Sequence, residues 1–97
     1  MAIGVLFEFP GVTQAQYDET LKKLKPEGAF TSLADWPVKG VQVHVAGPTE
    51  TGWRVLDVWD SEDDLKAFAA VLMPILKTAG FPDASPQIFP VHNFIKA

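Results

Sequence analysis

The sequence has no cysteine, which excludes disulfides and thiolate-bound metal sites. Basic residues are also scarce, because twelve aspartates and glutamates outnumber eight lysines and arginines. The densest basic group is Lys22, Lys23 and Lys25. Binding to nucleic acid or to an anionic membrane requires a basic stripe that neutralises phosphates, and this sequence contains none. We therefore expect neither a nucleic-acid partner nor a membrane partner.

Long hydrophobic runs are missing as well. No segment approaches the roughly 20 apolar residues that cross a bilayer. The N-terminal apolar run is interrupted at Glu8 and has no basic residues before it, which predicts a strand and not a signal peptide. The lack of cysteine fits a reducing compartment. We expect a cytoplasmic protein.

Apolar and aromatic residues, in contrast, are abundant for so short a chain. The 97 residues suit one domain, residues 1–97, and 47% of them are hydrophobic. A domain of this size buries only roughly 60 to 65% of the surface of its unfolded chain. Either the core is dense, or some apolar surface is buried against a second copy of the chain.

The first half of the sequence predicts a strand, a helix and a loop. The strand covers residues 2–9, and Pro10 and Gly11 end it with turn chemistry. Thr13 and Gln16 form a capping-box pattern for a helix that reaches about Leu24, where Pro26 and Gly28 stop it. Residues 26–39 show no period, and a loop of this length is expected to be functional or to cover something.

The second half predicts a hairpin, a helix and a last strand. Residues 41–60 form the hairpin, and Ser61 caps a helix whose end is marked by Gly80. Pro74 lies inside this helix and is expected to kink it or split it in two. Residues 86–95 form the last strand, where Pro90 favours an edge position or a bulge. The order βαββαβ predicts an α+β, ferredoxin-like fold: a four-stranded antiparallel sheet with two helices on one face.

The hairpin separates its side chains into two different sets. A turn centred between Thr49 and Glu50 would place Ala46 opposite Trp53, His44 opposite Val55, and Gln42 opposite Asp57. One face would then be almost purely aliphatic, and we expect the helices to cover it: Val41, Val43, Val45, Leu56 and Val58, with Arg54 near the open end. The other face, expected to pack on a second copy, would hold Gln42, His44, Ala46, Trp53, Val55, Asp57 and Trp59.

His44 and Asp57 are the predicted catalytic residues. Across the hairpin they are expected to be diagonal neighbours, about 7 to 8 Å apart between backbones. A carboxylate there could fix the imidazole tautomer and raise its basicity, as a general base requires. The alternative is a buried polar pair with a purely structural role.

The remaining candidates would bind a small aromatic or apolar ligand. Its flat rings could stack on tryptophans, and polar side chains could bind its oxygens. These predicted substrate-binding residues are Tyr17, Trp36, Gln42, Trp53, Trp59 and His92. A metal site on His44, His92, Asp57 and Glu8 is conceivable, but no close spacing motif supports it. We predict no metal and no cofactor.

Three stretches carry a resemblance to a known family: "VHVAGPTETGWRVLDVWDSEDDL", "FAAVLMPILKTAG" and "PVHNF". With the βαββαβ order, they resemble small bacterial dimeric α+β barrel proteins similar to the antibiotic biosynthesis monooxygenase superfamily. The resemblance implies a homodimer whose two sheets form a barrel with the helices outside. Members include cofactor-free quinone-forming monooxygenases, haem-degrading enzymes, cyclases and isomerases. Many bind their ligand between helices and sheet.

Two functions therefore remain open. One is a monooxygenase-like enzyme or ligand-binding protein that acts on a flat, apolar, oxygenated molecule, with His44 as base and Asp57 as its orienter. The other is a non-catalytic homodimerisation domain in which the same residues build the interface.

Overall fold

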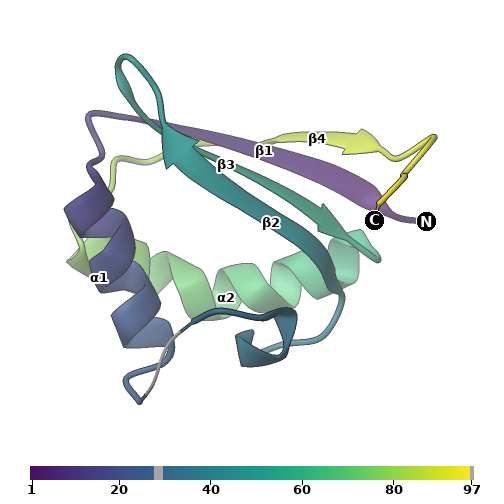
Figure 1. Cartoon of the computed structure of the whole chain (residues 1–97), viewed down its shortest axis with the longest axis horizontal. Helices are drawn as coiled ribbons and strands as arrows, with labels where there is room; N and C mark the ends of the chain where they lie inside the picture. Colours follow the sequence, from purple (N-terminus) through teal and green to yellow (C-terminus); the bar gives the residue numbers. More distant parts are fainter. Residues whose placement is uncertain (28–29, 97) are drawn as a thin grey trace.

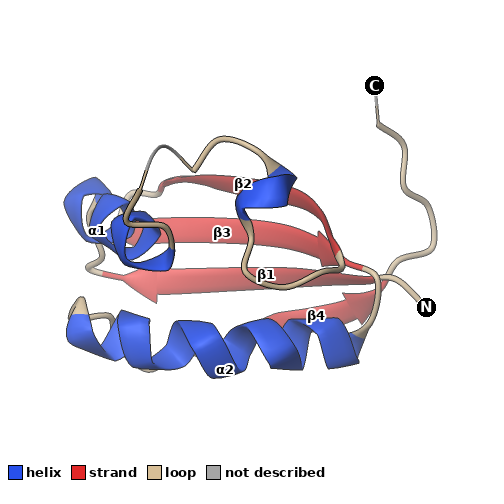
Figure 2. Ribbon diagram, turned by 90° about the horizontal axis from the view of Figure 1, so that it is seen from below, coloured by secondary structure: helices blue, strands red, loops and turns tan. Residues whose placement is uncertain are grey.

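A computed structural model describes residues 1–27 and 30–96. The elements follow the predicted order, with one 3₁₀ turn (η1) in the loop before the hairpin (Figure 1). Their bounds are β1 Ile3–Pro10, α1 Gln14–Leu24, η1 Leu33–Asp35, β2 Val41–Pro48, β3 Gly52–Trp59, α2 Glu62–Thr78 and β4 Gln87–Pro90. The strands form one antiparallel sheet in the order β2-β3-β1-β4, with both helices on one face (Figure 2). The predicted ferredoxin-like α+β fold is confirmed.

The helix ends follow the predicted capping. The Thr13 side chain accepts from the backbone N–H of Gln16, and the Gln16 side chain accepts from the backbone N–H of Thr13 at 3.0 Å. Ser61 caps α2 by accepting from the backbone N–H of Asp64 at 3.2 Å. After α2, Gly80 adopts a φ of +81°, which suits glycine. The predicted stop at Gly28 lies outside the described residues.

Pro74 was predicted to kink α2 or split it in two, and the helix is not split. The helix runs without interruption from Glu62 to Thr78. A proline in this position leaves the carbonyl of Ala70 without its helical donor. Both residues lie on the exposed side of α2, where water can bind that carbonyl.

Within the described residues, no helix is both long and apolar enough to span a membrane.

The last strand is shorter than predicted. It covers four residues, Gln87–Pro90, and pairs only with β1 at the edge of the sheet. Its edge position agrees with the expectation from Pro90, which cannot donate to a further strand. Residues 91–96 continue beyond the sheet as an irregular segment (Figure 2).

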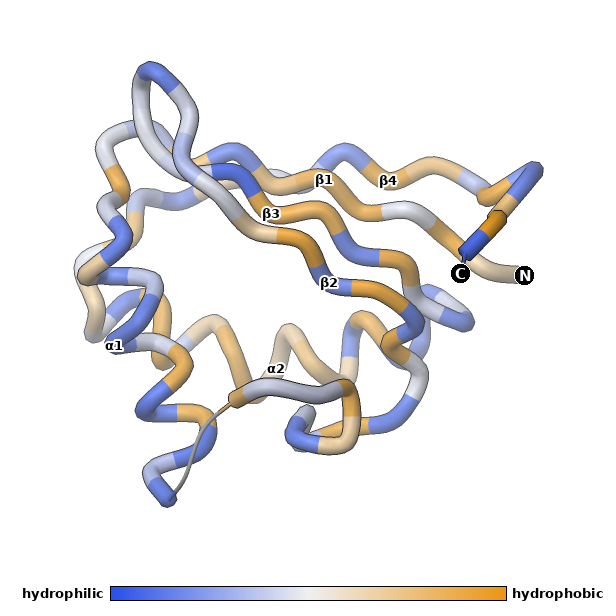
Figure 3. Tube along the Cα trace, in the orientation of Figure 1, coloured by the Kyte–Doolittle hydropathy of each residue, from blue (hydrophilic) through white to orange (hydrophobic). Residues whose placement is uncertain are grey.

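The prediction that the aliphatic hairpin face packs under the helices is wrong. The face with the tryptophans is covered instead: Trp53, Val55, Asp57 and Trp59 are all buried. The aliphatic face is open, and Val45 and Leu56 are 56% and 37% exposed there. Figure 3 shows the hydrophobic residues that run along the strands and through α2.

The central strand β1 explains this inversion. Ile3, Val5, Phe7 and Phe9 alternate along it, pair with Trp59, Asp57, Val55 and Trp53, and are buried. Their neighbours Leu6 and Glu8 share the opposite face with Leu56 and Arg54. The side with the larger side chains therefore fills the space beneath two helices, because burial of big aromatic groups contributes most to the core. The alternation within the hairpin alone could not indicate which side that would be.

The hairpin register also differs from the prediction. His44 pairs with Asp57, and Pro48 pairs with Trp53, so the turn is centred one residue later, between Glu50 and Thr51. A β-bulge between Val41 and Val43 absorbs an extra residue. The bulge changes only the pairing of Val41, whereas the shifted turn places His44 and Asp57 directly opposite each other, closer than the diagonal arrangement that was predicted.

Candidate active site

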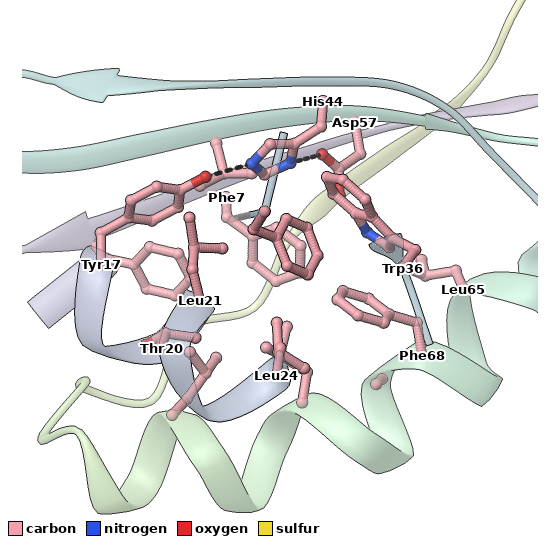
Figure 4. A pocket seen from close by; sticks show the side chains of 16 residues that line it. Phe7, Tyr17, Thr20, Leu21, Leu24, Trp36, His44, Asp57, Leu65 and Phe68 are labelled. Atoms are coloured by element: carbon pink, nitrogen blue, oxygen red, sulfur yellow. Dashed lines mark hydrogen bonds and ion pairs between the residues drawn. The ribbon is translucent and has the colours of Figure 1, made fainter. Parts of the chain in front are cut away.

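A small cavity lies between the sheet and the helices. Its volume is about 60 Å³, and its lining comes from α1, α2, three strands and the loop before β2 (Figure 4). Most of the walls are phenyl and aliphatic side chains, such as Phe7, Leu24 and Phe68. Polar groups are few and lie mainly at the sheet side, where Tyr17, His44 and Asp57 form a row (Figure 4).

These three polar residues form a continuous hydrogen-bonded chain, which we call the relay. The Tyr17 hydroxyl is 2.5 Å from His44 Nε2, and His44 Nδ1 is 2.7 Å from Asp57 Oδ1. The second carboxylate oxygen, Asp57 Oδ2, accepts from Trp59 Nε1 at 3.3 Å. Asp57 is only 4% exposed, so these contacts satisfy a carboxylate that water cannot reach.

The local folding of three elements assembles the relay. Tyr17 stands in the first turn of α1, directly after the capping box, and His44 and Asp57 are paired across β2 and β3. The Tyr17 ring lies nearly parallel to the His44 ring at a centroid distance of 6.1 Å. Trp53 packs behind Tyr17 at 5.1 Å, and Trp36 packs edge-on against His44 at 5.0 Å. Aromatic groups therefore fix both rings.

The environment of Tyr17 determines where the protons of the relay lie. Burial, together with the negative charges of Asp57 and Asp18, raises the pKa of Tyr17 from 10.0 to about 12. The hydroxyl therefore keeps its proton at neutral pH and can donate it to His44 Nε2 when the imidazole is neutral. Because the Asp57 carboxylate can only accept, the hydrogen of the neutral imidazole lies on Nδ1. In this arrangement the Tyr17 O–H points to His44, and the His44 Nδ1–H points to Asp57. A lone pair of the Tyr17 oxygen can then accept a hydrogen bond from a ligand.

Tyr17 is the single tyrosine of the chain, so its titration can be followed without overlap. We expect the phenolate absorbance of the folded protein to rise with a midpoint near pH 12, and that of the urea-unfolded chain near pH 10. The raised pKa of the folded state stabilises the fold fully below pH 10, and this contribution is lost as the pH rises toward 12. Circular dichroism at each pH separates titration from alkaline unfolding. A native midpoint at pH 10 would contradict the buried phenol.

The structure brings four of the predicted site residues together at the cavity: Tyr17, Trp36, His44 and Asp57. Trp53 and Trp59 support them from behind without lining it. Gln42 lies elsewhere and donates to the side chain of Asp60. His92 is exposed in the segment that follows β4. Among the described residues from β4 onward, up to residue 96, none lines the cavity.

The alternative metal site is not assembled. Glu8 lies on the open sheet face and accepts from Arg54 at 2.9 Å, away from His44. Across residues 1–27 and 30–96, no three histidine or carboxylate side chains are grouped closely enough to hold a metal ion.

Several lining residues escaped the sequence analysis. Thr20 is buried and lines the cavity, and its hydroxyl donates to the carbonyl of Gln16 at 3.0 Å. Thr20 follows Tyr17 by three residues and precedes Leu24 by four, so it lies on the same helix face as these two residues. The sequence pattern did not indicate this, because only apolar residues were assigned to that face. Phe30 also lines the cavity, in a loop whose sequence has no period that could have revealed it.

Comparison with known proteins supports the fold. No protein-family model matches the chain, and no curated protein matches its sequence. Among solved structures, the chain is similar to SnoaB, a cofactor-independent oxygenase from Streptomyces nogalater, with a TM-score of 0.62 and 13% identity over 99% of this chain and 97% of that one. A mutant of SnoaB gives a TM-score of 0.60 and 11% identity over 99% and 96%. Identities this low show a shared fold, and the function must be argued from the site.

Proposed function

We propose that the protein binds a flat, apolar molecule with an ionisable hydroxyl, such as a phenol, and removes the hydroxyl proton as the first step of a monooxygenase-like reaction. The observation that carries this proposal is the relay of Tyr17, His44 and Asp57 in the wall of an otherwise apolar cavity. A buried acid–base chain beside an apolar cavity is the arrangement that phenol deprotonation requires.

The proton has a defined path along the relay. A ligand hydroxyl would donate to the free lone pair of the Tyr17 oxygen, while Tyr17 passes its own proton to His44 Nε2. The imidazolium that forms lies 2.7 Å from the Asp57 carboxylate, and opposite charges at this distance stabilise each other. Asp57 thus orients His44 and compensates its charge, as the predicted base and orienter would.

In the proposed reaction the electron-rich phenolate then reacts with dioxygen. In the proposed overall reaction a phenol and one O₂ give a quinone and one water. One oxygen atom becomes the new carbonyl, and the other leaves as water with the hydroxyl hydrogen and one ring hydrogen. The phenol loses four electrons and O₂ gains them, so no further reductant is required. The likeness to a cofactor-independent oxygenase supports this reaction class at the level of the fold.

The proposal is tested with a naphthol as probe. Absorbance distinguishes naphthol from naphtholate, and an oxygen electrode follows the consumption of O₂. We expect saturable binding with partial conversion to naphtholate below the free pKa of the probe, and O₂ uptake in equal molar amount to naphthoquinone formed. Absence of binding for the naphthol and for a panel of quinols would contradict the proposal.

We also propose that the protein is a homodimer whose two open sheet faces pack together. The open face carries exposed apolar side chains on three strands, among them Val45 on β2, Leu56 on β3 and Phe89 on β4. Exposed apolar groups gathered on one face are typical of an interface. This surface replaces the tryptophan face that the sequence analysis assigned to the second copy.

Replacing Leu56 with lysine should convert the dimer to a monomer. Two lysines would meet near the centre of a symmetric interface, where burial of unpaired charge is strongly unfavourable. Light scattering coupled to chromatography at micromolar concentration should give twice the chain mass for the wild type and once for the variant. Lys66→Ala, an exposed change on α2 at the opposite side of the sheet, is the control and should remain dimeric. A monomeric wild type would contradict the proposal.

The open-face dimer differs from the alternative of a dimerisation domain built from His44, Asp57 and the tryptophans. Asp57, Trp53 and Trp59 are buried within their own chain, and His44 and Trp36 are partly buried there, which favours the open face as the interface. The relay and the open face are on opposite sides of the sheet, so dimerisation and ligand binding do not compete for one surface.

A further inference from the structure

One wall separates the cavity from a second hollow at the surface. The inner cavity has a volume of about 60 Å³, and an open groove of about 280 Å³ lies on the other side of the wall. Five residues line both hollows: Tyr17, Leu21, Phe30, Trp36 and His44. Sites for small molecules of several rings are typically a few hundred Å³ in volume. A flat bicyclic ligand therefore fits only if part of this wall moves.

The wall residues differ in what holds them. Tyr17 and His44 are bound to each other and through His44 to Asp57, so their displacement breaks the relay. Trp36 has aromatic contacts with His44 and with Phe30, at centroid distances of 5.0 and 4.4 Å. Its indole Nε1 is buried and finds no acceptor among the described residues. Trp36 can therefore move without the loss of a hydrogen bond.

The unpaired indole N–H of Trp36 can form a hydrogen bond with a bound ligand. Its desolvation cost is already present in the free protein. A ligand oxygen that accepts from it adds a hydrogen bond and removes that cost. The gain falls beside the relay, because the Trp36 ring packs against the imidazole of His44.

We propose that Trp36 is the specificity-determining residue of the site: it gives way to a flat ligand and donates its indole N–H to an uncharged acceptor oxygen, such as a carbonyl, on that ligand. The inference rests on the proposed function, since the ligand hydroxyl is placed on the relay. It adds a second requirement, so that the preferred ligand carries both a hydroxyl and a carbonyl on a flat ring system.

The chain offers a matched control for this inference. Trp53 Nε1 is also buried without an acceptor among the described residues. Trp53, however, packs behind Tyr17 and does not line the cavity. Trp36→Phe and Trp53→Phe therefore remove the same unpaired donor, once at the cavity and once outside it.

Isothermal titration calorimetry with two probes tests the inference. A naphthol offers the hydroxyl alone, and a hydroxyacetonaphthone adds a carbonyl to the same ring system. We expect Trp36→Phe to weaken hydroxyacetonaphthone binding about three- to ten-fold, the range that one neutral hydrogen bond supplies, and to change naphthol binding less than about two-fold. Trp53→Phe should leave the ratio of the two dissociation constants unchanged. Trp36→Leu repeats the measurement if Trp36→Phe does not fold.

The outcomes separate the two proposals. If neither probe binds the wild type, the proposed function fails and the inference fails with it. If both probes bind and Trp36→Phe weakens them equally or not at all, Trp36 has only a packing role, and the inference alone is overturned. An effect of Trp53→Phe equal to that of Trp36→Phe would also overturn it, because the donor at the cavity would have no special part.

Discussion

Replacing His44 with glutamine should reduce naphthol oxidation at least about 100-fold, because general-base catalysis by a positioned side chain contributes about 10²- to 10⁴-fold. Glutamine can keep a hydrogen bond to Tyr17 or Asp57 but cannot take up the proton that the ligand releases. Binding of the naphthol should change far less than its conversion to naphtholate. Absorbance titration measures both quantities in one experiment, and the oxygen electrode measures turnover.

Two further variants make this result specific. His92→Gln is the matched control, since the same substitution is made at an exposed histidine away from the cavity, and it should retain wild-type turnover. Asp57→Asn should lose most of the activity, although the two side chains have nearly the same size. The asparagine amide can donate to His44 Nδ1, which moves the imidazole hydrogen to Nε2 and prevents Nε2 from accepting a proton. Wild-type turnover in His44→Gln would show that the relay is not the base.

Replacing Trp59 with alanine should lower the free energy of unfolding by about 3 to 5 kcal/mol, the range for removal of a large aromatic group from a core. Trp59 is fully buried and packs against Phe68 at 5.2 Å. Its indole also supplies one of the hydrogen bonds of the buried Asp57. Urea unfolding followed by circular dichroism measures the difference at fixed protein concentration.

The control for this change is Val71→Ala on the exposed side of α2, where we expect a change within about 0.5 kcal/mol. A loss below about 1 kcal/mol for Trp59→Ala would contradict the assignment of the tryptophan face to the core.

The sequence predicted the order of elements well because its signals are local. The capping box of Thr13 and Gln16, the cap at Ser61 and the turn at Gly80 each depend on residues a few positions apart. The strand alternation of the hairpin was correct except at the start of β2, where the bulge places Val41 opposite Trp59, on the tryptophan face and against the core. A split of α2 at Pro74, one of the two predicted effects, does not occur, because Pro74 and Ala70 lie on the side of the helix that faces water.

The choice of the covered face could not be made from the hairpin. It depends on the pairing of β3 with β1, which begins about fifty residues earlier in the chain, and on the matching of Phe7 and Val5 with Val55 and Asp57. The direct pairing of His44 with Asp57 followed from a turn shifted by one residue, and this shift leaves no mark in the sequence pattern.

Most residues of the candidate site could be selected from the sequence, but their arrangement in space could not be predicted. His44, Asp57, Tyr17 and Trp36 were selected as residue types suited to proton transfer and to ring stacking. That Tyr17 reaches His44 depends on how α1 sits on the sheet, which no local pattern encodes. Phe30 joins the wall from an aperiodic loop, and only tertiary packing places it there.

A crystal structure of the complex with a naphthol tests the central claim most directly, because it shows where the ligand lies. We predict that the ring occupies the space between helices and sheet, with Trp36 displaced and with the naphthol oxygen within about 2.5 to 3.0 Å of the Tyr17 hydroxyl. A naphthol bound on the open sheet face, or bound under the helices with its oxygen turned away from the relay, would contradict the account.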